Sequence, residues 1–239
     1  MQFKNYKKAI EDVNKAIDLN PEEPEYYYLR GWVYYRLKNY NTAIEDVTKA
    51  IDLNPEEPEY YYLRGDSYYR LKNYKKAEED VNKAIDLDPN APNHFYLRGW
   101  IYYRLKNYNT AIEDATNAIN LNPDKPHYFR LRGWAYFHLK NYKKVIEDAT
   151  KAIDLNPNEP QYFRLRGDAY FHLKDYKKAA EDANKAIDLN PDNSDHFNLR
   201  GWAYYYLKNY NTAIEDANKA IDLNPDKPNP FRLRGWAYY

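Results

Sequence analysis

Arginine and aspartate recur along the chain at positions where opposite charges could either pair or bind a ligand. Successive arginines of the series are 34 residues apart, and the aspartates keep the same step. Identical recurrence at near-core positions favours a structural role. We therefore expect each arginine to form a partly buried, hydrogen-bonded ion pair with an aspartate of an adjacent helix, and a row of ligand-binding arginines is the alternative. The two series are Arg30, Arg64, Arg98, Arg132, Arg166, Arg200 and Arg234, and Asp12, Asp46, Asp80, Asp114, Asp148, Asp182 and Asp216.

The other reactive residue types do not assemble into a recognisable catalytic or metal site. The chain has no cysteine, which excludes a thiolate nucleophile and a disulfide framework. Ser67 and Ser194 are the only serines, and the repeat places no histidine beside either one. His138 and His172 occupy equivalent positions on neighbouring helices, but no carboxylate or cysteine completes a zinc ligand set there. We expect these histidines to line a groove, and we expect no enzymatic activity, no metal and no cofactor.

Composition and charge exclude several classes of partner. Lysine plus arginine and aspartate plus glutamate both number 36, so the basic excess of a general nucleic-acid binder is absent. The apolar runs are too short for a membrane span, and the N-terminus has no hydrophobic signal region. We therefore expect no nucleic acid and no membrane as partner, and a cytoplasmic location is favoured. With 29 tyrosines at a mean hydropathy of −1.02, aromatic rings must supply most of the packing.

The elements that position these residues follow from a strict repeat. Glycine occurs seven times, each time 34 residues after the previous one, from Gly31 to Gly235. One proline series, from Pro21 to Pro225, keeps the same step. A fixed period of this length is typical of stacked copies of one small unit, each of which contacts its neighbours without a single central core. We therefore expect function on the surface that the stacked copies share.

One repeat is predicted to contain two helices joined by a short turn. Pro24 stands where the first helix begins, since proline is tolerated in the first helical turn. A turn follows over residues 38–40, where Asn39 is a suitable N-cap for a second helix over about residues 41–53. Gly31 lies inside the first helix, where glycine costs about 1 kcal/mol relative to alanine. Its recurrence indicates that a neighbouring helix approaches too closely for a side chain.

Over its whole length the chain resembles the tetratricopeptide repeat (TPR) family. The family pattern is a helical hairpin with an aromatic residue, glycine and tyrosine in the first helix (helix A), two alanines around a larger apolar residue in the second (helix B), and a final proline. The resemblance implies an all-α, right-handed superhelical solenoid of antiparallel helix pairs, whose helices A line the concave face. Members bind extended peptides or partner proteins there, as scaffolds and not catalysts. Lys38 departs from the pattern by replacing a common turn glycine. The matching residues of one repeat are Tyr27, Gly31, Tyr34, Ala43, Val47, Ala50 and Pro55.

The resemblance also predicts how the chain is divided. We expect a single array over residues 1–239 that starts with a helix B at about residues 7–19 and ends in a helix A at about residues 228–239. A final helix A can pack on the first helix B of another molecule, which favours open, head-to-tail self-association. The repeat units between these helices are 24–57, 58–91, 92–125, 126–159, 160–193 and 194–227.

The positions that face the groove in the family pattern vary between copies, whereas the scaffold positions barely change. They are the second, fifth, ninth, twelfth and thirteenth of each repeat. The ninth is tryptophan in five of seven copies, and the twelfth is always aromatic. Because exposed tryptophan is unfavourable without a use, we interpret this surface as shaped for a partner, with drift at solvated positions as the alternative. The candidate partner-binding residues are Tyr28, Trp32, Tyr35, Arg36, Tyr62, Asp66, Tyr69, Arg70, Tyr96, Trp100, Tyr103, Arg104, Arg130, Trp134, Phe137, His138, Arg164, Asp168, Phe171, His172, Asn198, Trp202 and Tyr205.

The candidate groove is an aromatic wall that carries charged residues. Such a surface suits an extended peptide with apolar or proline side chains, because rings pack on those side chains and the charges fix the register. Rows of rings could also stack on sugars, which makes a glycan the weaker alternative ligand. We therefore expect a scaffold that binds a protein or extended peptide, with a self-assembling structural array as the second possibility.

Overall fold

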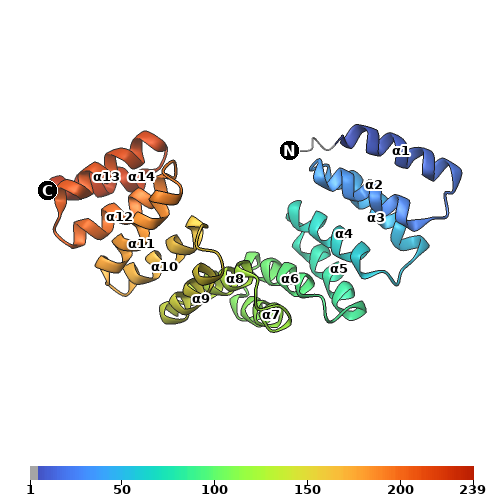
Figure 1. Cartoon of the computed structure of the whole chain (residues 1–239), viewed down its shortest axis with the longest axis horizontal. Helices are drawn as coiled ribbons and strands as arrows, with labels where there is room; N and C mark the ends of the chain where they lie inside the picture. Colours follow the sequence, from blue (N-terminus) through green and yellow to red (C-terminus); the bar gives the residue numbers. More distant parts are fainter. Residues whose placement is uncertain (1–4) are drawn as a thin grey trace. The chain divides into compact units, whose positions relative to one another are not determined.

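The computed structural model describes residues 5–239, where every regular element is an α-helix, as predicted (Figure 1). The even-numbered helices correspond to helices A and the odd-numbered ones to helices B. None of the helices in this range has the length and apolarity needed to cross a bilayer. The helices are α1 (Tyr6–Leu19), α2 (Pro24–Arg36), α3 (Tyr40–Leu53), α4 (Pro58–Arg70), α5 (Tyr74–Leu87), α6 (Pro92–Arg104), α7 (Tyr108–Leu121), α8 (Pro126–His138), α9 (Tyr142–Leu155), α10 (Pro160–His172), α11 (Tyr176–Leu189), α12 (Ser194–Tyr206), α13 (Tyr210–Leu223) and α14 (Pro228–Tyr238).

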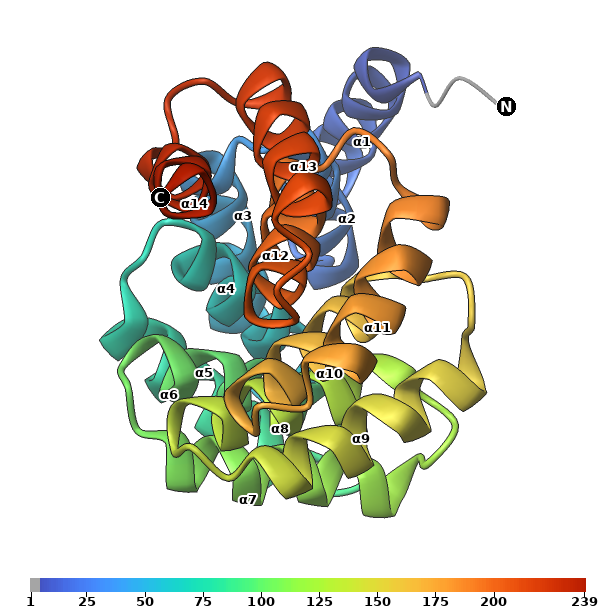
Figure 2. The same ribbon diagram turned by 90° about the vertical axis from the view of Figure 1, so that its left-hand side faces the viewer.

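The helices group into two compact units, Met1–Asn122 and Pro123–Tyr239, which we call the N-terminal and the C-terminal unit. In the N-terminal unit α2 packs on α3 and α4 packs on α5, and in the C-terminal unit α10 packs on α11 and α12 on α13. Each of these pairs also packs on the next, through α3 and α4 in one unit and through α11 and α12 in the other. Figure 2 shows α9, α10 and α11 side by side. The predicted stacking of antiparallel helix pairs is thus present within each unit.

Local sequence explains where the helices begin and end. Pro24 occupies the first position of α2, where its missing N–H removes no intrahelical hydrogen bond. Asn39 caps α3, because its side-chain oxygen accepts a hydrogen bond from the Thr42 backbone N–H at 3.4 Å. At the other end of α3, the backbone N–H of Asn54 donates to the carbonyl of Ala50 at 2.9 Å. The predicted N-cap at Asn39 is confirmed.

Lysine holds a left-handed backbone conformation in the turns between helix A and helix B. In the first of these turns the Lys38 N–H donates to the Tyr35 carbonyl at 2.9 Å, and the Asn39 N–H donates to the Tyr34 carbonyl at 2.9 Å. A positive φ costs a non-glycine residue about 1 kcal/mol, a cost that glycine would avoid. The lysines with φ between 58° and 64° are Lys38, Lys72, Lys106, Lys140, Lys174 and Lys208.

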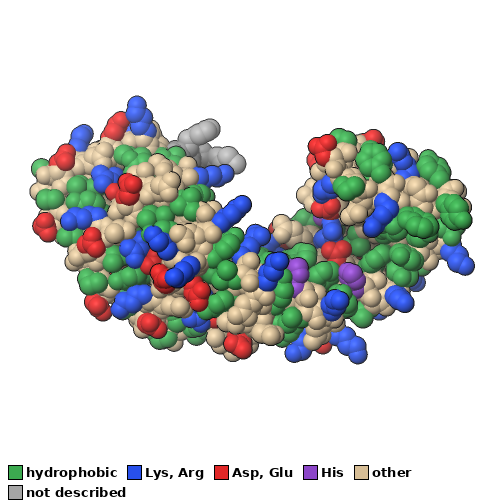
Figure 3. Space-filling view, turned by 180° about the vertical axis from the view of Figure 1, so that it is seen from behind, with side chains coloured by type: hydrophobic (Ala, Val, Ile, Leu, Met, Phe, Trp, Pro, Cys, Tyr) green, Lys and Arg blue, Asp and Glu red, His purple; other side chains and the backbone are tan. Residues whose placement is uncertain are grey.

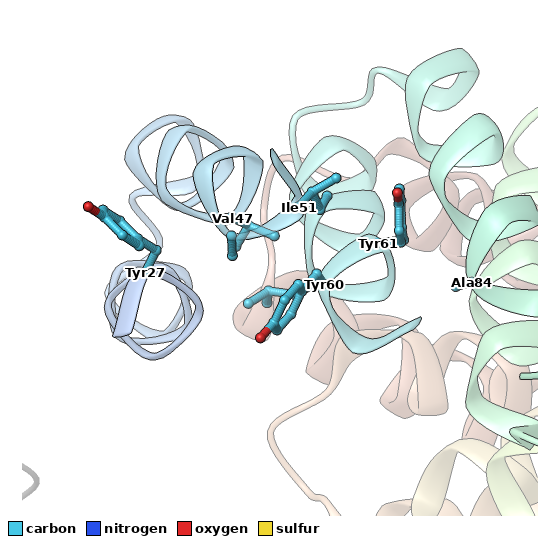
Figure 4. Close-up of a cluster of buried hydrophobic side chains, with 8 residues drawn as sticks. Tyr27, Val47, Ile51, Tyr60, Tyr61 and Ala84 are labelled. Atoms are coloured by element: carbon cyan, nitrogen blue, oxygen red, sulfur yellow. The ribbon is translucent and has the colours of Figure 1, made fainter. Parts of the chain in front are cut away.

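The recurring glycine lets helix A approach helix B closely. A Cβ atom added to Gly31 would lie 2.7 Å from Val47 Cγ2 and 3.2 Å from the Ala43 carbonyl oxygen, both on α3. The close approach predicted at Gly31 is therefore confirmed. Beside this contact, Val47 and Ile51 of α3 pack with Tyr60 of α4 in one buried cluster (Figure 4).

The predicted arginine–aspartate ion pairs are present wherever a helix A is followed by a helix B, whereas Arg234 and Asp12 form no such pair within residues 5–239. In a typical pair, Arg64 Nε and Nη2 each donate to one carboxylate oxygen of Asp80, both at 2.8 Å. The Arg64 side chain is 18% exposed and that of Asp80 is 9% exposed, so the two-bond contact is shielded from water. We call this contact the arginine clamp. The clamps are Arg30–Asp46, Arg64–Asp80, Arg98–Asp114, Arg132–Asp148, Arg166–Asp182 and Arg200–Asp216.

The clamp also reaches the preceding repeat. Arg64 Nη1 donates to Thr48 Oγ1 on α3 at 3.1 Å, and Arg98 Nη1 donates to Asn82 Oδ1 on α5 at 2.8 Å. The Arg64 guanidinium also lies 5.8 Å from the centre of the Tyr61 ring. One side chain thus joins its own helix A to two helices B. Because these donors are used within the protein, the contacts support the structural role over a row of ligand-binding arginines.

Two histidines are buried at the third position of helices A. His94 in α6 is 1% exposed and His196 in α12 is 2% exposed. Burial lowers the pKa of both imidazoles from the usual 6.5, because the charged form loses its hydration. A carboxylate oxygen of Glu59 lies 3.9 Å from His94 Nε2 and partly offsets that effect. His196 Nδ1 lies 3.3 Å from the Asn190 carbonyl oxygen. The folded chain therefore favours neutral imidazoles at both sites.

Removing one member of a clamp should destabilise the chain strongly. Asp80→Ala leaves the Arg64 guanidinium partly buried without its carboxylate, and losing one partner of a buried pair costs about 3–5 kcal/mol. Urea unfolding followed by circular dichroism measures this loss. Glu79→Ala removes the exposed carboxylate next in the chain and should change the free energy of unfolding by less than about 0.5 kcal/mol. Equal losses in the two variants would contradict the role of the clamp.

Acid should weaken the chain through its buried histidines. A histidine whose folded pKa is depressed contributes stability that is present above its unfolded pKa of about 6.5 and is lost as the pH falls towards the folded pKa. Between about pH 7.5 and about pH 5.5, the free energy of unfolding should therefore fall, because the unfolded chain binds protons at these histidines more readily than the folded chain does.

The variant that tests this carries both His94→Tyr and His196→Tyr, which install the residue found at this position in α4, Tyr60. Urea unfolding across the pH range should show that this part of the pH dependence has disappeared. His138→Tyr changes an exposed histidine and should leave the dependence intact. An unchanged slope in the double variant would show that the acid effect comes from other groups.

Candidate functional site

The predicted site residues of each helix A share one face. On α2, Tyr28, Trp32, Tyr35 and Arg36 lie at helical spacing, with the three rings half-buried and the arginine exposed. On the face of the C-terminal unit seen in Figure 3, hydrophobic side chains (green) gather in patches with charged side chains between them. The corresponding residues are Tyr62, Asp66, Tyr69 and Arg70 on α4, Tyr96, Trp100, Tyr103 and Arg104 on α6, Arg130, Trp134, Phe137 and His138 on α8, Arg164, Asp168, Phe171 and His172 on α10, and Asn198, Trp202 and Tyr205 on α12.

In the N-terminal unit, rings of this face contact one another. Trp100 meets Tyr103 edge to face with ring centres 5.2 Å apart, and it meets Tyr96 at 6.3 Å. Tyr28 contacts Tyr60 of the next helix A at 5.1 Å. Burial, with a smaller effect from nearby carboxylates, raises the pKa of Tyr28 to about 12. Rings of this wall therefore pack on one another, and burial holds the Tyr28 ring in its neutral form.

Asp66 and Asp168, which replace tryptophan at the ninth position, form hydrogen bonds with other residues of the candidate site. Asp66 accepts hydrogen bonds from the Tyr35 hydroxyl and from Arg70 Nε, the latter at 3.2 Å. Asp168 accepts a hydrogen bond from Arg164 Nε at 2.8 Å. Both carboxylates are thus paired with arginines of their own helices. Because an arginine offsets the negative charge of each carboxylate, these aspartates attract a positively charged partner less than unpaired aspartates would.

A cavity of about 550 Å³ opens on this face of the C-terminal unit. The Arg232 guanidinium lies 5.1 Å from the centre of the Trp202 ring, and the buried Oδ1 of Asn198 has no hydrogen-bond partner in the described part of the chain. Apolar walls with a few polar groups are typical of binding pockets. The lining residues are Phe171, Asn198, Trp202, Tyr205, Tyr206, Asn229, Arg232 and Trp236.

Half of these lining residues lie outside the predicted set. Tyr206, Asn229, Arg232 and Trp236 complete the cavity together with four predicted residues. In the order given, they occupy the thirteenth, second, fifth and ninth positions of their repeats. These are groove positions of the family pattern, so the sequence could have identified all four residues.

The two histidines considered for a metal are exposed, and one of them stacks on an aromatic ring. His172 is parallel to the Tyr142 ring, with centres 4.7 Å apart, and meets Phe137 edge to face at 5.3 Å. Tyr206 stacks on Tyr176 in the same way, at 4.6 Å. Within residues 5–239, no group of three or more histidine, cysteine, aspartate or glutamate side chains could hold a metal ion.

A second cavity, of about 470 Å³, lies at the C-terminal end of α4 in the N-terminal unit. Arg104 Nε donates to the Tyr69 hydroxyl at 3.4 Å, so adjacent helices A are joined beside the cavity. Lys72 and Tyr74 are absent from the predicted set because the sequence assigns their turn to the scaffold. The sequence feature that could have identified Lys72 is the recurrence of lysine at the same turn position in every repeat. The lining residues are Tyr69, Arg70, Lys72, Tyr74 and Arg104.

Sequence models of known families match most of the chain. Models described as "Tetratricopeptide repeat" match residues 95–125, 128–159, 160–193 and 194–227, which together exceed half of the chain. A model described as "Anaphase-promoting complex, cyclosome, subunit 3" matches residues 2–84. Comparison with curated proteins finds no match.

Solved structures with the same fold include Cut9–Hcn1, described as an APC/C hetero-tetramer, with a TM-score of 0.80 and 18% identity. That match covers 98% of this chain and 46% of the other, so the chain spans about half the length of this relative. PilF of Pseudomonas aeruginosa has a TM-score of 0.78 and 19% identity over 89% of this chain and 96% of the other. YrrB, described as a TPR protein with an unusual peptide-binding site, has a TM-score of 0.67 and 23% identity over 79% of this chain and 97% of the other. These likenesses confirm the predicted solenoid fold of antiparallel helix pairs.

Proposed function

Because the chain belongs to the tetratricopeptide repeat family, we propose that it is a non-enzymatic scaffold that binds an extended peptide or partner segment on the exposed face of its helices A. The TPR fold is that of a protein-interaction scaffold, and proteins of this family are generally not enzymes. The relative YrrB, with its described peptide-binding site, supports a peptide as the class of ligand.

The observation that carries this proposal is the aromatic cavity of the C-terminal unit. Trp202, Tyr205 and Trp236 line it together with amide and guanidinium groups, and Trp236 remains 51% exposed. Tryptophan, tyrosine and arginine are the residue types that most often dominate binding energy at interfaces. A cavity of about 550 Å³ accommodates the large side chains of a bound segment.

The polar groups of the cavity supply the direction and register of such a segment. The buried Oδ1 of Asn198 can accept a hydrogen bond from a peptide N–H, and Arg232 can bind a peptide carbonyl or carboxylate. Asp168 contributes less, because Arg164 already neutralises it. The side-chain amides therefore take over the register role that the sequence assigned to this aspartate.

Self-assembly is the second candidate function, favoured by the exposed surface of α14. Tyr238 is 69% exposed, and a Cβ atom added to Gly235 would have no neighbour within 4 Å, unlike the one at Gly31. Arg234 donates to Asn218 at 2.7 Å but forms no ion pair within the described part of the chain. The equivalent face of α1 carries Asp12, which is exposed, so a second copy could complete this clamp.

Truncating one ring of the cavity should abolish most of the peptide affinity. Peptides selected from a random displayed library on the full chain are to be measured by titration calorimetry against Trp202→Ala. A central aromatic contact is worth about 2 kcal/mol or more, so affinity should fall about thirtyfold. Leu139→Ala, at a residue that is 44% exposed and outside the cavity, is the matched control.

Two outcomes would contradict peptide binding at this site. One is selected peptides that bind Trp202→Ala as tightly as the parent chain. The other is a library that yields no binder while an oligosaccharide array does, which would favour the glycan alternative.

Self-assembly should appear as growth with concentration in sedimentation velocity. If α14 packs on a second copy, the parent chain forms a ladder of larger species, and Trp236→Glu with Tyr238→Glu restores the monomer because charged side chains resist burial. Leu207→Glu, at a residue that is 45% exposed in another part of the chain, controls for added charge. A single monomeric species at every concentration would contradict this function.

A further inference from the structure

Basic side chains gather where the helices A of the N-terminal unit end. The thirteenth position of each repeat there is arginine, and the turn that follows carries lysine in the left-handed conformation. All of these side chains are exposed. We call this surface the basic rim. Its residues are Arg36, Lys38, Arg70, Lys72, Arg104 and Lys106.

At one place the rim forms a defined pocket. Arg70, Lys72 and Arg104 surround the cavity of about 470 Å³ together with the rings of Tyr69 and Tyr74. Arg104 Nε donates to the Tyr69 hydroxyl at 3.4 Å, and within residues 5–239 the two Nη groups of the guanidinium make no hydrogen bond. Three cationic groups from two adjacent repeats thus converge on one volume.

Little negative charge in the chain compensates the rim. Arg70 Nε forms an ion pair with Asp66 at 3.2 Å, and within residues 5–239 this is the one ion pair that any rim residue makes. Asp66 is also held by the Tyr35 hydroxyl, which shares its charge. Although the whole chain has no net charge, this edge of the N-terminal unit carries a local positive potential.

The C-terminal unit lacks this arrangement at the same positions of the repeat. His172 and Tyr206 replace the arginine there and stack on Tyr142 and Tyr176, with ring centres 4.7 Å and 4.6 Å apart. The turn lysines remain, as at Lys174. The same edge of the repeat therefore carries exposed arginines in the N-terminal unit and stacked aromatic rings in the C-terminal unit.

We propose that the basic rim binds carboxylate side chains of the partner segment, so that the segment is acidic where it crosses the N-terminal unit. The proposal rests on the proposed function and adds the chemistry of the partner. Arginine binds a carboxylate through two parallel hydrogen bonds, and the lysine beside it adds a mobile cation. Packed helices lie about 8–10 Å apart and an extended peptide advances about 3.3–3.6 Å per residue, so an acidic residue at every third position matches the rim.

The experiment compares two labelled peptides by fluorescence anisotropy with the full chain. The probe peptide has glutamate at every third position between alanine and serine, and its partner has glutamine instead. The glutamate peptide should bind about tenfold more tightly at low salt, and the difference should shrink as salt rises. Equal affinities of the two peptides would overturn the proposal.

Matched variants assign the binding to the rim. Lys72→Gln with Arg104→Gln should weaken binding of the glutamate peptide about tenfold. Lys174→Gln with Lys208→Gln removes the same number of charges from the C-terminal unit, at turn positions with φ of 64° and 62°, and should change it less than twofold. Circular dichroism checks that both variants stay folded. Equal losses in the two variants would overturn the proposal.

Two further outcomes separate this inference from the proposed function. If an oligothymidylate binds as tightly as the glutamate peptide and responds equally to the rim variant, the rim attracts polyanions in general and the proposal fails. If library-selected peptides need Trp202 but carry no acidic residues and ignore the rim variant, the scaffold function stands while the acidic partner is overturned.

Discussion

The stacking of the repeats depends on an arginine of helix A whose guanidinium binds side chains of two helices B. Arg166 donates to both carboxylate oxygens of Asp182 in its own repeat and to Thr150 in the preceding one. A partly buried charge is tolerable only while its partners stay in place, so this side chain sets how one repeat sits on the next. Helical spacing puts the arginine opposite the groove residues, such as Asp168 of the same helix. The clamp therefore constrains the residues on one face of helix A, while the residues on the opposite face can vary between repeats.

That freedom gives the two units different surfaces on one scaffold. In the N-terminal unit, the thirteenth position holds Arg70 and Arg104, whose charges stay at the surface. In the C-terminal unit, His172 and Tyr206 at this position stack on the rings of Tyr142 and Tyr176. Arginine at this position thus gives a cationic edge, and histidine or tyrosine gives an aromatic one, on helices A of the same length.

The sequence predicts what depends on short spacing and misses what depends on rotamers. Helix ends follow from proline and from caps such as Asn39, and the close approach at Gly31 follows from the missing side chain. The contact between Asp66 and Tyr35 does not follow from such spacing. Tyr35 and Asp66 are 31 residues apart, so their contact depends on how two neighbouring helices A pack and not on a pattern within either one.

The offsets within the clamp have a consequence for how such a gene can change over generations. Arg98 binds Asp114, 16 residues after it, and Asn82, 16 residues before it. Because both partners lie within one period, an unequal crossover that inserts or deletes a whole copy preserves both spacings for arginines such as Arg98. An insertion of a few residues inside one of these helices instead turns a clamp residue away from its partner, because each added residue rotates the helix face by about 100°. Recombination in whole copies is therefore a mutational route by which a coding sequence of this kind can lengthen or shorten while its clamps keep their partners.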